Sequence, residues 1–124
     1  MAVNTTVPFF KPGQDITGYP TAAVLAKTFV KSVDGGRGGL THIAPAVAGQ
    51  PALGVAGHDA ETAQETHVIV GGIVPVLAAA DIVAGTQVEV GTGGRIIPRA
   101  TGTAVGYATA SGASGTAVPV KLYG

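Results

Sequence analysis

The chain has 124 residues, which favours one compact domain. Hydrophobic residues make up 46% of it, but there is no Trp and there are only three Phe and three Tyr, so small side chains must form a thin core. Burial against neighbouring subunits would stabilise such a core. The absence of Cys excludes disulfides, thiolate zinc sites and cysteine nucleophiles.

Charged residues are only 11% of the chain, and their signs are segregated. Residues 1–40 carry four basic and two acidic residues, residues 41–90 carry five acidic residues and no Lys or Arg, and residues 91–124 carry three basic residues and no acidic one. Scattered surface charge is the simpler interpretation. The alternative is that acidic and basic edges of different subunits meet and set their register.

Two classes of partner are not expected from this composition. No dense basic patch indicates nucleic-acid binding. No stretch approaches the roughly 20 uninterrupted apolar residues that a membrane helix needs. The first residues show no basic region followed by a long apolar run, so we expect a soluble protein made in a cytoplasm, with no membrane partner.

Residues 1–20 differ from the rest of the chain. Pro8, Pro12 and Pro20 are spaced through them, and Pro removes backbone donors and blocks a continuous strand or helix. Phe9 and Phe10 stand side by side. We therefore expect an extended N-terminal arm over residues 1–20, with a short strand at residues 14–17, leading into a single β domain over residues 21–124.

From residue 21 onward, short β-type segments alternate with turn signals. Strands are expected at residues 28–33, 53–56, 67–70, 73–77, 87–90, 95–97, 104–108 and 117–122. Residues 91–94 predict a hairpin and residues 111–115 predict a turn. Gly71-Gly72 predicts a tight hairpin or a bulge. Residues 34–39 predict a flexible, exposed loop. Residues 78–83 are the best helix candidate, and residues 60–64 are a weaker one. The predicted fold is all-β, a small β-barrel or β-sandwich with an extended N-terminal arm and at most one or two short helices.

Two segments of the chain show weak sequence similarity to each other. Residues 52–56 (ALGVA) resemble residues 104–108 (AVGYA), and each is followed by a polar turn and a β-rich run. Chance is the simpler explanation in a chain dominated by Ala, Gly and Val. Otherwise Gly54 and Gly106 occupy equivalent sheet positions, where the missing side chain lets another backbone approach.

Few residues suggest chemistry. His58-Asp59 with Glu61 is the only acid–imidazole cluster, and adjacent residues point apart on a strand. Glu65 and His67 share a strand face, but two ligands make a poor metal site. His42 stands alone, and Gly35-Gly36-Arg37-Gly38-Gly39 lacks the Gly-Lys-Ser/Thr ending of a phosphate-binding loop. We expect no catalytic residue, no metal site and no cofactor, and therefore no enzyme.

The order of several soft motifs resembles a known family. Pro12-Gly13-Gln14-Asp15-Ile16-Thr17 is followed by Leu53-Gly54-Val55-Ala56, by Gly71-Gly72-Ile73-Val74-Pro75-Val76, by the AGTQVEV run of residues 84–90, and by Val105-Gly106-Tyr107-Ala108 leading to the VPVKL run of residues 118–122. This order is similar to that of the small capsid decoration (cement) proteins of tailed phages, the family labelled DUF2190, over roughly residues 12–124. The loop at residues 35–39 and the length of the arm depart from the family pattern, which defines no residue-level site.

The resemblance implies a decoration protein on the outer surface of a tailed-phage head. It implies a small β body that clusters as trimers on local symmetry axes of the capsid and clamps adjacent capsomers against internal DNA pressure. The expected partners are therefore the major capsid protein and further copies of the chain in a homotrimer. Two alternatives remain: a tail-tube or connector-type virion protein, and a small carbohydrate- or host-surface-binding module that would use Tyr19, Phe29, Tyr107 and Tyr123.

The arm carries the predicted capsid contact. An extended segment with two aromatic side chains can lie along a neighbour's sheet edge, with its rings anchored in pockets. Capping of the chain's own barrel is equally compatible with the sequence. The residues assigned to capsid contact are Val7, Pro8, Phe9, Phe10 and Lys11.

Overall fold

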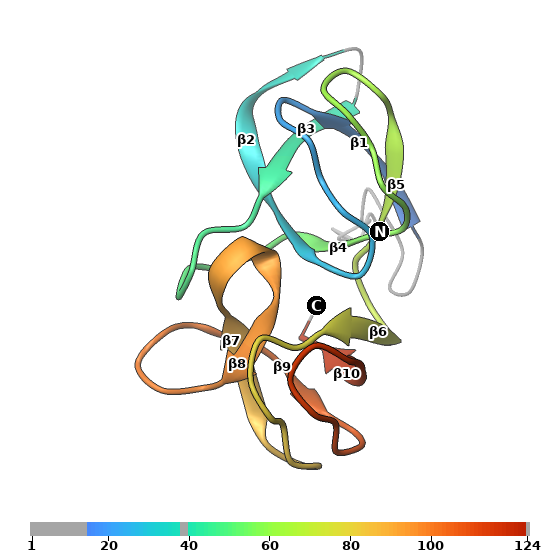
Figure 1. Ribbon diagram of the computed structural model, residues 1–124. Helices are drawn as coiled ribbons and strands as arrows, with labels where there is room; N and C mark the ends of the chain where they lie inside the picture. Colours follow the sequence, from blue (N-terminus) through green and yellow to red (C-terminus); the bar gives the residue numbers. More distant parts are fainter. Residues whose placement is uncertain (1–14, 38–39, 124) are drawn as a thin grey trace, which may run out of the picture.

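A computed structural model describes residues 15–37 and 40–123 and shows two five-stranded units (Figure 1). The first unit is a closed barrel, and the second is a curved sheet that lies beneath it in Figure 1. In this part of the chain the one helical element is the three-residue 3₁₀ turn η1 (Thr92–Gly94). The predicted all-β class is confirmed.

The first barrel consists of the strands formed by residues 15–69. Its strand order is β1-β3-β2-β4-β5, and antiparallel pairing of β5 with β1 closes it. Val30, Ile43 and Val68 are fully buried in its interior. The strands are β1 (Asp15–Pro20), β2 (Phe29–Arg37), β3 (Leu40–Pro45), β4 (Gly54–Ala56) and β5 (Thr66–Ile69).

The second sheet has the order β6-β10-β9-β7-β8. Ala78, which directly follows β6, forms a parallel bridge with Ile96 of β8 and so joins the two edges of the sheet. The strands are β6 (Ile73–Leu77), β7 (Gln87–Val90), β8 (Ile96–Pro98), β9 (Ala104–Ala108) and β10 (Ala117–Leu122). The predicted hairpin around residues 91–94 is confirmed, because β7 pairs antiparallel with β8 across η1.

The two units repeat one arrangement. β1 pairs antiparallel with β5 and parallel with β3, and β6 likewise pairs antiparallel with β10 and bridges parallel to β8. The isolated bridge between Val24 and Ala60 has its counterpart between Ile82 and Gly112. Strands β1 to β5 therefore correspond one by one to strands β6 to β10.

Two glycines confirm this correspondence. A Cβ atom on Gly54 would lie 2.4 Å from the carbonyl oxygen of Ile69 in β5, and a Cβ atom on Gly106 would lie 2.4 Å from the carbonyl oxygen of Lys121 in β10. Both contacts are too close for any side chain. The predicted equivalence of the two Gly-containing strands is therefore confirmed, together with its physical cause.

The first barrel packs on the second sheet through outward-facing apolar side chains. Phe29, Ala46 and Val55 belong to the hydrophobic cluster of the second sheet, not to the barrel interior. Backbone hydrogen bonds add to the contact. The amide of Gly49 donates to the carbonyl oxygen of Val90 at 2.8 Å, and the amide of Leu77 donates to that of Lys27 at 2.8 Å.

Both predicted helices are wrong. Residues 78–83 are irregular, with Ala78 bridged to β8 and Ile82 bridged to Gly112. Residues 60–64 form a turn in which Ala63 has a φ of 66°, a value incompatible with a right-handed helix. In both segments, pairing with distant residues overrides the helix propensity of Ala.

Two further expectations need correction, and one strand was missed. Gly71-Gly72 forms neither a hairpin nor a bulge, since β5 pairs within the first barrel and β6 pairs with β10; the two glycines carry the chain from one unit to the other. Residues 34–37 are not a loop but continue β2, which pairs again with β3 at Arg37. No strand was predicted at β3, which joins β1 to β2 in the barrel.

Part of the predicted N-terminal arm lies within the described residues. Residues 15–20, assigned to the arm, form β1, which pairs with both β3 and β5 and so belongs to the barrel body. A strand was expected there, but a shorter one, at residues 14–17. Pro20 occupies the last position of β1, where a missing backbone donor is tolerated.

Candidate assembly surfaces

The predicted capsid-contact residues 7–11 lie outside the described residues. The described chain begins at Asp15, which pairs with Ile69 at the end of β5, next to Val70. Val70 lines a cavity between the first barrel and the second sheet. The described chain therefore begins close to the junction of the two units.

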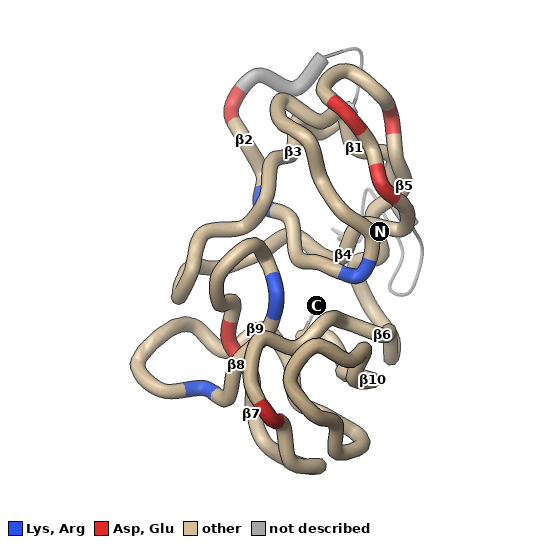
Figure 2. Tube along the Cα trace, in the orientation of Figure 1, with Lys and Arg blue, Asp and Glu red and all other residues tan. Residues whose placement is uncertain are grey.

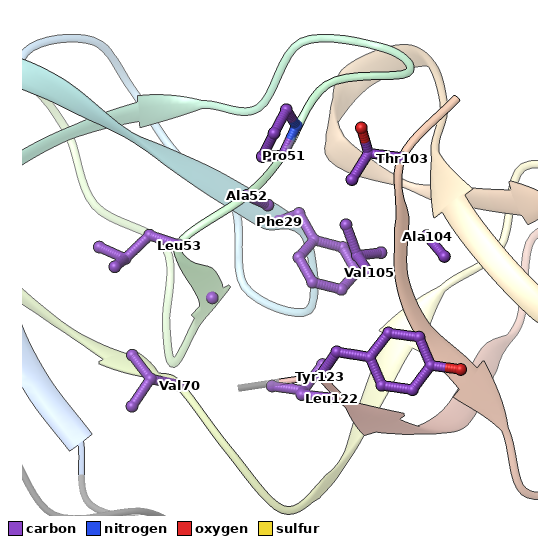
Figure 3. A pocket seen from close by; sticks show the side chains of 11 residues that line it. Phe29, Pro51, Ala52, Leu53, Val70, Thr103, Ala104, Val105, Leu122 and Tyr123 are labelled. Carbon is purple, nitrogen blue, oxygen red and sulfur yellow. The ribbon is translucent and has the colours of Figure 1, made fainter. Parts of the chain in front are cut away.

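The junction cavity has a volume of about 180 Å³ and is lined by both units (Figure 3). Leu53 and Val70 come from the first barrel, and their counterparts Val105 and Leu122 come from the second sheet. The cavity is partly open, and its lining offers little for chemistry.

The outer face of the second sheet carries a row of side chains, of which Ile73, Gln87 and Lys121 are exposed and Tyr107 is half-buried. Lys121 pairs with Ile73 on one side and with Tyr107 on the other, and Tyr107 pairs with Gln87, so the four residues cross β6, β10, β9 and β7 in register. Ile73 is 61% exposed. We call these four residues the outer row.

Tyr123 extends the outer row. Its ring lies 6.2 Å from the ring of Tyr107, and its hydroxyl accepts a hydrogen bond of 3.0 Å from Nε2 of Gln87. Of the other aromatic residues considered for a glycan-binding face, Phe29 is buried in the junction and Tyr19 stacks on His42 at 5.0 Å. The four aromatics therefore do not form one exposed face.

The connection between β4 and β5 carries three of the five acidic residues of the first barrel. Asp59, Glu61 and Glu65 are all exposed, and Figure 2 shows acidic positions near β1 and β5. An open groove beside them is lined by Ala23, Val24, Leu25, Asp59, Ala60, Glu61 and Gln64. We call it the acidic groove.

Glu89 is a buried carboxylate that sequence reasoning did not single out. It is 5% exposed, and its Oε1 accepts hydrogen bonds from the amides of Ala100 at 2.5 Å and Gly102 at 3.4 Å. A Cβ atom on Gly102 would overlap the carboxylate. Glu89 thus fixes the connection between β8 and β9, next to Gly49 of the first barrel.

Replacing Glu89 with Ala should lower the free energy of unfolding by about 1–3 kcal/mol, because the amides of Ala100 and Gly102 lose their acceptor. Urea denaturation followed by circular dichroism measures the loss. The control is Glu65→Ala, an exposed site where a change within about 0.5 kcal/mol is expected. Equal stability of the two variants would contradict the structural role of Glu89.

The ring nitrogens of His58 bond to groups other than the carboxylates of Asp59 and Glu61. Nδ1 of His58 lies 3.0 Å from the backbone carbonyl oxygen of Asp59, and Nε2 of His58 lies 3.1 Å from Oγ1 of Thr66. The rings of His58 and His67 meet edge to face at 5.4 Å. Within residues 15–37 and 40–123, no three His, Asp or Glu side chains gather as metal ligands. In that same part of the chain, no helix is long and apolar enough to cross a bilayer.

The fold and these surfaces define a small all-β protein built from two repeated units, with broad exposed sheet faces and scattered polar side chains. The chain belongs to the phage cement protein family, whose model matches residues 10–122. As a member of this family it is a capsid-surface protein of the virion, and the predicted resemblance to a capsid decoration family is confirmed. No curated protein matches the chain.

A solved structure shares the fold. The chain is similar to the N base of the head fiber protein gp8.5 of bacteriophage phi29, with a TM-score of 0.75 and 22% sequence identity. The match covers 89% of this chain and 93% of that one. At this identity the likeness is evidence for the fold alone.

Proposed function

We propose that this protein stabilises a tailed-phage head by clamping neighbouring capsomers, as a homotrimer bound to the major capsid protein. The family match over residues 10–122 is the observation that carries the proposal. It covers all ten strands of the described body and also includes Phe10 and Lys11 of the arm. The exposed sheet face of the second unit adds a surface on which subunits can assemble.

Trivalency supplies the clamping strength. One subunit contact of modest affinity becomes strong when two further contacts follow at high effective concentration, with a gain of about 10²–10⁴ in overall affinity. A trimer whose three contacts lie on different capsomers resists their separation, because all three contacts must break for it to leave. The thin core of each subunit is stabilised at the same time by burial in the trimer.

The arm is proposed to make the capsid contact. Lys11 precedes Asp15 by only a short segment, which spans about 13 Å when extended. Residues 7–11 can therefore reach past the barrel surface from their attachment beside β5. Phe9 and Phe10 would supply buried anchors and Lys11 a polar contact at the rim, the combination found in energetically strong interfaces.

Deletion of residues 2–12 should abolish binding to particles that lack the protein, measured by co-sedimentation. A matched pair of point variants sharpens the test: Phe9→Ala with Phe10→Ala should weaken binding strongly, whereas Thr5→Ala with Thr6→Ala should not. Unfolding temperature and oligomeric state of the deleted protein serve as controls for the body. Undiminished binding after the deletion would show that the arm is not the capsid contact.

A further inference from the structure

We infer that a second copy of the chain docks on the outer row of the second sheet, and that it does so with the acidic groove of its first barrel. The inference rests on the proposed self-association and names the two surfaces that make it. Ile73, Lys121 and Tyr107 form the centre of one surface. Leu25 and Glu61 form the centre of the other.

The internal repeat shows why the outer row is a docking face. In the first barrel the corresponding side chains are Ile69, Val55 and Phe29, which are paired in register across β5, β4 and β2. All three pack into the hydrophobic cluster of the second sheet. The same face of the fold is therefore covered by a neighbouring unit in the first barrel and left open in the second sheet.

The composition of the outer row fits a contact between subunits that also exist free in solution. Ile73 is 61% exposed and Tyr123, beside the row, is 48% exposed, which leaves apolar and aromatic surface uncovered. Tyr107 and Gln87 replace the fully apolar Val55 and Phe29 of the first barrel. Tyrosine at the centre of a patch with a polar surround is typical of protein–protein interfaces.

Charge selects the partner surface. Lys121 has no ion-pair partner among the described residues, and neither has Glu61. In the first barrel the acidic positions Asp59, Glu61 and Glu65 follow β4, whereas their counterparts in the second sheet are Ser111, Ala113 and Ala117. The acidic groove also contains Leu25, which is 55% exposed and can meet Ile73 while Glu61 meets Lys121.

The two surfaces belong to different units, so the contact is heterologous. Each copy offers its outer row to one neighbour and its acidic groove to another. Such head-to-tail contacts close into a ring when the rotation per subunit allows it. A ring of three copies accounts for the proposed trimer.

A charge exchange tests the inference on the full chain. Lys121→Glu alone and Glu61→Lys alone should each lower the trimer fraction at least tenfold in analytical ultracentrifugation at low salt, because each places like charges across the contact. The double variant Lys121→Glu with Glu61→Lys should recover the trimer, since the pair is restored with its signs exchanged. Glu65→Lys, an exposed acidic site of the same connection outside the acidic groove, is the matched control and should trimerise like the parent.

The outcomes separate the inference from the proposed function. Trimers in both single variants, or no recovery in the double variant while circular dichroism shows it folded, would overturn the inference. If such variants still bind particles, the proposed function stands without it. A parent chain that stays monomeric up to millimolar concentration would also overturn the inference, and a parent chain that fails to bind particles would overturn the proposed function.

Discussion

Replacing Phe29 with Ala is expected to lower the free energy of unfolding by about 3–5 kcal/mol. The Phe29 side chain is 2% exposed and lies in the cluster that joins the first barrel to the second sheet. It also lines the junction cavity of about 180 Å³, so its loss enlarges an existing void instead of allowing the walls to collapse. Urea denaturation followed by circular dichroism gives the difference.

A graded series shows whether packing at the junction is the cause. Phe29→Leu keeps most of the buried volume and should lower the free energy of unfolding by less than half as much as Phe29→Ala does. Tyr123→Ala removes an aromatic ring that is 48% exposed beside the same cavity and should cost still less. If Phe29→Ala lowers the free energy of unfolding no more than Tyr123→Ala does, the two units are not held together through Phe29.

A folded variant that remains monomeric should bind capsids about 10²–10⁴-fold more weakly than the parent. The arm of such a variant is intact, so each individual contact is unchanged, and only the linkage between three contacts is lost. Ile73→Asp is a suitable variant, because it places a charge in the outer row at a side chain that is 61% exposed and therefore contributes little to the fold. Titration of undecorated particles with labelled protein measures the affinity.

The matched control is Val83→Asp, which changes an aliphatic residue that is 66% exposed on the connection between β6 and β7, away from the outer row. This control should keep both the trimer and the affinity of the parent. Equal capsid affinity of a monomeric Ile73→Asp protein and the trimeric control would show that trivalency does not contribute to binding.

Local patterns in the sequence predicted the strands well where they were self-contained. The alternation of residues 87–90 and the Gly-rich turn after them were enough to predict the β7–β8 hairpin. The segment at residues 78–83 failed, because its conformation is set by the partners Ile96 and Gly112, which are distant in sequence. β3 was missed for a similar reason, since its place in the barrel depends on pairing with both β1 and β2.

From the sequence we recognised the internal repeat only around Gly54 and Gly106. Elsewhere the corresponding core residues are exchangeable aliphatics, such as Val24 and Ile82, which leave no distinctive pattern. One further signal was present: Gly35-Gly36-Arg37 recurs as Gly93-Gly94-Arg95. The outer row could not be found from sequence, because alternation tells which side chains point outward but not which outward face a neighbouring unit covers.

Cryo-electron microscopy of decorated heads tests the central claim most directly. The account predicts trimeric density on the outer capsid surface, with each subunit resting on a different capsomer and its N-terminal segment in contact with the major capsid protein. Density of single subunits confined within one capsomer would contradict it, because such a protein could not hold neighbouring capsomers together.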